Sequence, residues 1–213
     1  DSALYDAKSA GKNQFKTYST TLQKEISRRR HLKLGMSRAT RDQSFRLHFQ
    51  PLVDLQTLTV KGAEALLRWE CDGEAISPGE FVPLAEESDL ILDIDRWVVA
   101  EALKWQLYWS EFNPDFAMHL NLSARFIAGN NIEWLGDVLE EAGYIGRGLC
   151  AEVTETAIIT DLDTARKNLK ALRAMGFDVA LDDFGTGYSS LNHLAQLPLD
   201  ALKIDRSFVK GIE

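Results

Sequence analysis

Short apolar runs alternate with longer amphipathic stretches along the chain from about residue 45 onward. The short runs end in polar residues, which is typical of strands at the edge of a buried sheet. The longer stretches repeat their apolar positions at helical spacing. Strands that alternate with helices favour an α/β fold with a mainly parallel sheet. The predicted strands cover residues 45–53, 59–69, 117–123, 149–155, 178–184 and 201–209.

The predicted helices lie between these strands, with one exception at the start. The first two strands are joined by a connection too short for a crossover helix, so we expect them to be antiparallel. Ser77, Pro78 and Glu80 offer an N-cap, a proline at the first helical position and a capping-box glutamate. The predicted helices cover residues 80–88, 92–112, 132–143, 163–176 and 189–197.

The number of predicted strands limits which fold the chain can form. A TIM barrel has eight strands and about 250 residues. The pattern here yields six strands, and the sequence ends just after the sixth, at Glu213. The prediction is therefore a TIM-type (β/α)8 barrel with an antiparallel first strand, truncated after the sixth strand.

Composition narrows the class of protein. The 213 residues carry a net charge of −8, which disfavours binding to a DNA or RNA duplex, because such proteins usually present a basic face. The sequence has no signal peptide and no apolar run near the ~20 residues of a membrane helix. We expect a cytoplasmic domain without membrane contact from this stretch, within a parent protein that can itself be membrane-anchored. Cys71 and Cys150 lack the spacing of a zinc motif and fit a reducing cytosol as free thiols.

Polar side chains stand at or near the ends of five predicted strands. In a barrel, strand ends of one polarity meet in a single mouth, where barrel enzymes keep their chemistry. Carboxylates gathered there repel one another unless a cation holds them, so the pattern indicates a hard metal with oxygen ligands. The residues concerned are Glu64, Asn121, Glu152, Asp182, Asp183 and Lys203.

Two of these acids, Asp182 and Asp183, are neighbours in one strand. Successive side chains of an ideal strand point to opposite faces, so both can reach one site only if the strand bends or bulges there. The glycines at positions 185 and 187 would allow such a turn. We therefore expect an irregular strand at this pair.

Simpler interpretations compete with some of these assignments. Most Asp and Glu side chains lie at the surface without a function, although the repeated placement at strand ends weakens that interpretation here. His119 shares the face of Asn121, but a lone histidine is more often a packed residue than a ligand. The basic run at residues 28–30 has no interleaved aromatic residues and is interpreted as a solvated helix face.

Several motifs together resemble the EAL domain family, whose members are bacterial phosphodiesterases that linearise cyclic di-GMP to pGpG. The motifs are EALLRW, NLS, EVTET, DDFGTGYSSL and LKIDRSFV, in this order. The N-terminal stretch ALYDAKSAGKNQF similarly resembles the tail of a GGDEF (diguanylate cyclase) domain. The resemblance implies a GGDEF-like tail at residues 1–18, a helical linker at 19–43 and an EAL-type barrel at 44–213.

The resemblance also implies roles for individual residues. Two divalent cations, Mg²⁺ or Mn²⁺, would polarise the phosphate and activate the attacking water. Lys203 would orient that water or offset charge in the transition state, and Glu155 would anchor the loop at residues 184–190. Asp205 would contact the residues of the site without binding the cations itself. The metal ligands would be Glu64, Asn121, Glu152, Asp182 and Asp183, and the substrate contacts would come from Arg68, Gln50 and Leu66.

Alternatives stay open at this point. The family has a further metal-binding glutamate and a glutamine that would fall beyond residue 213, so we expect that the chain as written can be inactive. A non-catalytic EAL domain that binds cyclic di-GMP or a partner protein is the main alternative, and an unrelated metal-dependent barrel enzyme is the second. A homodimer is expected from the resemblance. Cyclase activity is not expected, because the cyclase's own catalytic segment is absent from this sequence.

Overall fold

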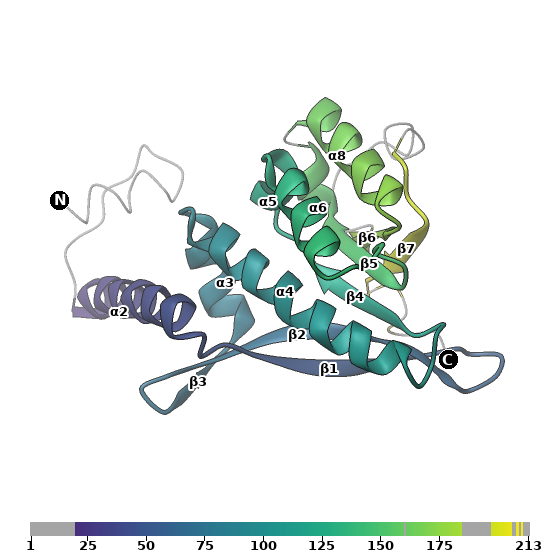
Figure 1. Ribbon diagram of the computed structural model, residues 1–213. Helices are drawn as coiled ribbons and strands as arrows, with labels where there is room; N and C mark the ends of the chain where they lie inside the picture. The colour runs from purple at the N-terminus through teal and green to yellow at the C-terminus, as the bar shows by residue number, and fades with distance from the viewer. Residues whose placement is uncertain (1–19, 160, 185–196, 206–207, 209, 211–213) are drawn as a thin grey trace.

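The computed structural model confirms an α/β fold with a central sheet (Figure 1). The GGDEF-like stretch at residues 1–18 and nearly all of the predicted helix at 189–197 lie outside the described residues. The division of the chain into three segments stays a prediction. Among the residues that the structure describes, no helix is both long enough and apolar enough to cross a membrane. The structure describes residues 20–159, 161–184, 197–205, 208 and 210.

The sheet follows the order β1-β2-β4-β5-β6-β7, with β3 paired to β2 alone. β1 and β2 are antiparallel, as expected, and the pairs from β2–β4 onward along this path are parallel. The short strand β3 was missed by the sequence pattern. The strands are β1 Arg46–Val53, β2 Val60–Cys71, β3 Glu74–Ile76, β4 Ala117–Asn121, β5 Leu149–Thr154, β6 Asp178–Phe184 and β7 Ala201–Ile204.

The helices α3, α4, α5, α6 and α8 lie on one side of the sheet (Figure 1). Their apolar faces pack against buried side chains of the strands, such as Met118 and Leu120 of β4, which have no exposed surface. Two short helices, α5 and α7, were not predicted, because one helical turn leaves no periodic pattern. The helices are α2 Thr20–Asp42, α3 Pro78–Glu86, α4 Leu90–Ser110, α5 Ala124–Ala128, α6 Asn131–Glu141, α7 Glu155–Ile159 and α8 Leu162–Ala174.

Helix α2 packs against the rest of the molecule. Leu32 and Met36 of this helix are fully buried in a second apolar cluster that includes Trp69 and Phe81. The basic run stays at the surface, in agreement with its interpretation as a solvated helix face, and two of its members also form ion pairs. Arg28 forms ion pairs with acids of β3 and α3, and Arg29 pairs with the Glu87 carboxylate just after α3.

The start of α3 differs from the predicted capping box. Pro78 does begin the helix, but Ser77 makes no side-chain capping hydrogen bond. The Glu80 carboxylate instead accepts a hydrogen bond from Arg28 Nε at 2.9 Å. The long-range pair with α2 therefore takes the glutamate that a capping box would use.

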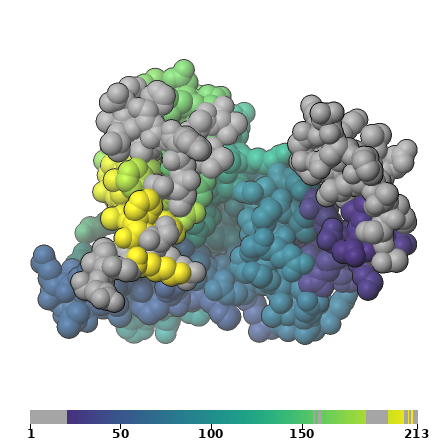
Figure 2. Space-filling model, turned by 180° about the vertical axis from the view of Figure 1, so that it is seen from behind, coloured from purple at the N-terminus to yellow at the C-terminus, as the bar shows by residue number. Residues whose placement is uncertain are grey.

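The sheet is strongly curved. β2 and β7 are four strand spacings apart along the sheet, which in a flat sheet would separate them by about 19 Å. Lys203 Nζ of β7 nevertheless lies 3.1 Å from Glu64 Oε2 of β2. Figure 2 shows the yellow C-terminal residues next to the blue strands at the start of the sheet. This curvature agrees with a barrel-type sheet, while closure of an eight-stranded barrel stays a prediction.

The paired acids lie at an irregular point of β6, as expected. Leu181 pairs with Leu202 and Phe184 pairs with Ile204, so three steps along β6 match two steps along β7. Asp183 has a φ of +54°, in the left-handed region that non-glycine residues rarely adopt. One extra residue with this backbone is a bulge, which turns Asp183 out of the regular alternation.

Candidate functional site

Three carboxylates surround the ammonium group of Lys203 on the concave side of the sheet. Lys203 Nζ lies 2.5 Å from Glu152 Oε2, 3.1 Å from Glu64 Oε2 and 3.5 Å from Asp182 Oδ1. Asn121 Nδ2 donates a hydrogen bond to Glu64 Oε1 at 2.9 Å. These five side chains come from five different strands. The structure therefore brings together five of the six polar residues that the sequence placed at or near strand ends, although Glu64 lies inside β2 rather than at its end.

Strand register explains why these side chains meet. β4 and β5 pair Asn121 with Glu152, while β2 and β4 pair Glu64 with His119. Residues of like parity project to one face of a sheet. The odd-numbered residues of β4 therefore share the face of Glu64, and the apolar residues Met118 and Leu120 fill the helix-facing side.

His119 was set aside as a packed histidine, but it contacts the site. Its Nδ1 lies 2.8 Å from Glu152 Oε1, and its side chain is partly exposed. Glu152 is thus held on both oxygens, by His119 and by Lys203. The parity of His119 with Asn121 was the available signal, but the register between β4 and β5 had to be known to use it.

Burial and charge shift the proton equilibria of this site. Burial alone would lower the pKa of Lys203, but hydrogen bonds and charges from Glu152 and Glu64 outweigh it and hold that pKa above its ordinary value. Burial raises the pKa of Asp183, and the nearby charges of Asp182 and Asp205 add to the effect. Carboxylates therefore outnumber cationic side chains at this site, and a bound metal cation would balance their negative charge.

A cavity of about 400 Å³ adjoins the carboxylates, which is within the size range of small-ligand pockets. It lies between the ends of β2, β4 and β5 and the helices α3 and α4. Leu66 and Arg68 line it, together with Asn121 and Glu152 of the acidic site. Arg68 Nη1 donates to the Leu67 carbonyl at 2.8 Å, which holds the guanidinium close to the strand.

Asp95 also lines this cavity and was missed by the sequence analysis. It is 5% exposed and accepts a hydrogen bond from Ser123 Oγ at 2.5 Å. Burial raises its pKa to about 7, against the opposing effect of the Ser123 hydrogen bonds. The available signal was an acid on the apolar face of a predicted helix, beside Ile94 and Val98.

The remaining predicted residues take separate positions. Gln50 of β1 is the cross-strand partner of Glu64 and is exposed. Glu155 is 5% exposed at the first position of α7. Asp205 follows β7 and contributes charge to the surroundings of Asp183. The loop that Glu155 was expected to anchor lies outside the described residues from position 185 onward.

The donor atoms of the acidic site fit a hard cation. Glu64, Glu152, Asp182 and Asp183 offer carboxylate oxygens, and the Asn121 amide offers a carbonyl oxygen if it turns from its present hydrogen bond. Such oxygen donors suit Mg²⁺ and Mn²⁺ better than softer ions. Fold and site together define an α/β protein with an acidic centre on one face of its sheet.

Sequence comparison identifies the family. The EAL domain family matches residues 35–213, so the chain belongs to it. The match begins inside helix α2 and covers every strand of the sheet. This confirms the resemblance to EAL domains that the motifs indicated, while a preceding GGDEF tail stays a prediction.

Two curated relatives are similar over the whole chain. One is the bifunctional diguanylate cyclase/cyclic di-GMP phosphodiesterase MucR of Pseudomonas aeruginosa, at 36% identity over 215 residues. The other is the cyclic di-GMP phosphodiesterase PdeR of Escherichia coli, at 33% identity over 214 residues. The chain spans 31% and 32% of the length of these relatives.

Solved structures of similar proteins include cyclic di-GMP complexes. A MucR phosphodiesterase structure in complex with cyclic di-GMP is 38% identical, with a TM-score of 0.77 over 84% of this chain and 73% of that one. The FimX EAL domain of Pseudomonas aeruginosa bound to cyclic di-GMP is 28% identical, with a TM-score of 0.75 over 85% of this chain and 74% of that one.

Proposed function

We propose that this chain is the phosphodiesterase part of a bacterial signalling protein and hydrolyses cyclic di-GMP to linear pGpG. The observation that carries the proposal is the meeting of Glu64, Glu152 and Asp182 around Lys203, beside a ligand-sized cavity. Family membership and the similarity to cyclic di-GMP phosphodiesterases and to cyclic di-GMP complexes support the same substrate.

The acidic residues would hold two divalent cations, Mg²⁺ or Mn²⁺. When bound, such cations lower the pKa of a water molecule and polarise a phosphate oxygen. Glu152 is fully buried at its side chain, and contacts from His119 and Lys203 fix it in one orientation. This rigidity favours a preorganised centre. The proposed ligands are Glu64, Asn121, Glu152, Asp182 and Asp183.

Lys203 would act beside the cations. Its ammonium lies within 3.5 Å of three carboxylates, so it supplies positive charge where they converge. In the reaction this charge would orient the attacking water or offset the negative charge that develops on the phosphate. The raised pKa of Lys203 keeps the group protonated for that role.

Residues of the cavity wall would hold the substrate. Arg68 presents a guanidinium that can bind a phosphate with two parallel hydrogen bonds. Leu66 lies on the same face of β2, two positions earlier, and lines the cavity next to it. Gln50 projects from β1 opposite Glu64 and would contact the ligand from the other side. The expected homodimer stays a prediction.

Hydrolysis of cyclic di-GMP by the chain tests this proposal, with the nucleotides separated by chromatography. We expect pGpG in the presence of Mg²⁺ or Mn²⁺ and none with a chelator. Glu64→Gln should abolish turnover, because it removes a charged ligand while keeping the shape of the side chain. Glu70→Gln is the matched control, since Glu70 stands on the same strand but is exposed. Undiminished turnover by Glu64→Gln would contradict the proposal.

A further inference from the structure

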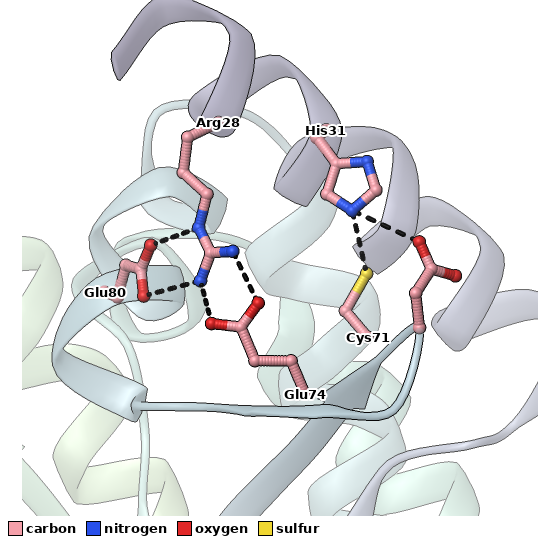
Figure 3. Close-up of polar contacts among 6 residues, drawn as sticks. Arg28, His31, Cys71, Glu74 and Glu80 are labelled. Atoms are coloured by element: carbon pink, nitrogen blue, oxygen red, sulfur yellow. Dashed lines mark hydrogen bonds and ion pairs between the residues drawn. The ribbon is translucent and has the colours of Figure 1, made fainter. Parts of the chain in front are cut away.

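A cluster of side chains of the types that can ligate a metal lies where α2 meets the β2–β3 hairpin (Figure 3). His31 Nε2 is 3.7 Å from Cys71 Sγ and 3.2 Å from Asp72 Oδ2. The donor atoms of the three residues all lie within 4.8 Å of one another. In the part of the chain that the structure describes, no other group of three or more His, Cys, Asp or Glu side chains brings its donor atoms this close together. It uses none of the residues of the acidic site.

The hairpin turn places two of the three donors. Cys71 pairs with Glu74, so Asp72 and Gly73 form a two-residue loop. Both have positive φ values, +50° and +82°, which is the pattern of a type I′ turn and explains the Asp-Gly sequence. The turn directs the buried Cys71 side chain toward α2 and places Asp72 beside His31.

A glycine in α2 allows the helix to approach the thiol. Gly35 lies one helical turn after His31, on the same face. A Cβ atom at position 35 would lie 2.7 Å from Cys71 Sγ and 2.9 Å from a ring carbon of Trp69. Any larger residue would push the helix away from the hairpin. Glycine lowers helix stability, so its place here fits the close contact between His31 and Cys71.

Neighbouring ion pairs hold the two elements in register. Arg28 Nη1 lies 2.7 Å from Glu74 Oε2, and Arg28 Nε lies 2.9 Å from Glu80 Oε1 (Figure 3). Lys33 Nζ lies 2.7 Å from Glu87 Oε2. These pairs flank His31 on both sides along the helix. They orient a helix that buried Leu32 and Met36 hold in place, so the three donors would need little rearrangement to bind an ion.

The donor types and distances fit zinc. Zinc prefers Cys sulfur, His nitrogen and carboxylate oxygen in a tetrahedral arrangement, whose bond lengths imply donor–donor distances of roughly 3.3–3.6 Å. The observed distances of 3.7 Å and 3.2 Å are close to that range. His31 and Asp72 are partly exposed, which leaves access for the ion and for a water molecule as fourth ligand.

We propose that His31, Cys71 and Asp72 form a zinc site that clamps helix α2 to the β2–β3 hairpin. Binding would convert the Cys71 thiol to a thiolate, with its proton released to solvent. The mixed nitrogen, sulfur and oxygen donors distinguish this site from the all-oxygen centre at the strand ends, which favours Mg²⁺ or Mn²⁺. The ion would join residues that are 40 positions apart in sequence.

Titration of the 213-residue chain with Co²⁺ and then Zn²⁺, in saturating Mg²⁺, tests the proposal. The Mg²⁺ would occupy the proposed acidic site and keep Co²⁺ and Zn²⁺ from it. Co²⁺ bound to a thiolate gives a charge-transfer absorption band, and Zn²⁺ should displace the ion and abolish the band. Zn²⁺ should also raise the melting temperature. Absence of a thiolate band in the unaltered chain would overturn the proposal.

Variants locate the ion. We expect Cys71→Ser and His31→Gln to weaken Zn²⁺ binding by about 100-fold or more, and Asp72→Asn by about 10-fold. His31 and Asp72 are exposed, so their variants remain informative even if Cys71→Ser does not fold. The controls are His48→Gln, exposed on β1, and Cys150→Ala in β5, which should bind Zn²⁺ as before. Unchanged affinity in His31→Gln and Asp72→Asn would contradict the site.

Discussion

Two regions of this molecule pair acids with cations, and they differ in burial. At the strand ends, the Glu152 side chain is 0% exposed and Lys203 is 28% exposed. At the contact of α2 with the β2–β3 hairpin and α3, Arg28 is 36% exposed and Glu74 is 58% exposed. The charges of the first region are costly to bury, whereas those of the second remain largely hydrated. Pairs of acidic and cationic side chains are therefore withdrawn from water in the first region and exposed to it in the second.

The difference in burial separates the carboxylates of the acidic site from the ion pairs that orient α2. Burying several carboxylates on one concave face costs stability, and family membership gives a reason for keeping them. The exposed pairs instead orient a helix whose docking rests on buried Leu32 and Met36. An acid–cation contact is thus informative about function mainly where it is withdrawn from water.

The largest expected effect comes from removing the cation of the buried region. Lys203→Met would leave Glu64, Glu152 and Asp182 facing one another, and breaking such a buried network costs about 3–5 kcal/mol. We expect that loss in urea unfolding with a chelator present, and partial recovery with Mn²⁺. Lys104→Met, which removes an exposed lysine paired with Glu101, is the matched control. Equal stability of the chelated variant and the parent would refute the account.

A smaller effect follows from the buried acid Asp95. Its pKa is about 7 in the folded chain and 3.8 ordinarily, so between these values the folded state keeps a proton that the unfolded state loses. Stability due to this group therefore falls as pH rises from about 4 to 7. We expect Asp95→Asn to remove this fall and to be more stable at pH 8 by about 2–4 kcal/mol.

Thermal or urea unfolding of the Asp95→Asn variant across that pH range provides the measurement. The amide can still accept the hydrogen bond from Ser123, so the comparison isolates the charge. Asp93→Asn is a suitable control, because Asp93 stands on the same helix but is exposed. A parallel pH dependence in the Asp95 variant and the parent would show that Asp95 does not carry the effect.

The smallest effect is expected in the exposed region. Arg28→Met removes the pairs with Glu74 and Glu80 but keeps much of the side-chain length. Exposed ion pairs contribute little and are screened by salt, so the unfolding midpoint should shift slightly at low salt and not at 1 M salt. A loss as large as that of Lys203→Met would remove the distinction between the two regions.

Much of the fold could be predicted from periodicity. The predicted strand at residues 178–184 coincides with β6, and the bulge at Asp182 and Asp183 was predicted from their adjacency. Strand β3 was missed because it has three residues, although the Asp72-Gly73 turn was a usable signal. The packing of α2 could not be predicted, because its buried residues contact segments far away in sequence.

The sequence could predict which face of each strand the site residues occupy. It could not predict how neighbouring strands align with one another. Glu64, Asn121, Glu152, Asp182 and Lys203 converge as the strand ends suggested. The contact of His119 with Glu152 depends on how β4 and β5 align, which parity alone does not determine.

The central claim is that the strand-end acids form a cation site, and the most direct test is to count bound Mn²⁺ by electron paramagnetic resonance. Zn²⁺ at no more than one equivalent per chain would first fill the proposed zinc site at α2, because excess Zn²⁺ would compete with Mn²⁺ for the carboxylates. We expect two bound Mn²⁺ per chain, a loss of binding in Asp182→Asn and unchanged binding in Glu70→Gln. Mn²⁺ binding that is absent from the parent chain, or equally strong in Asp182→Asn, would contradict it.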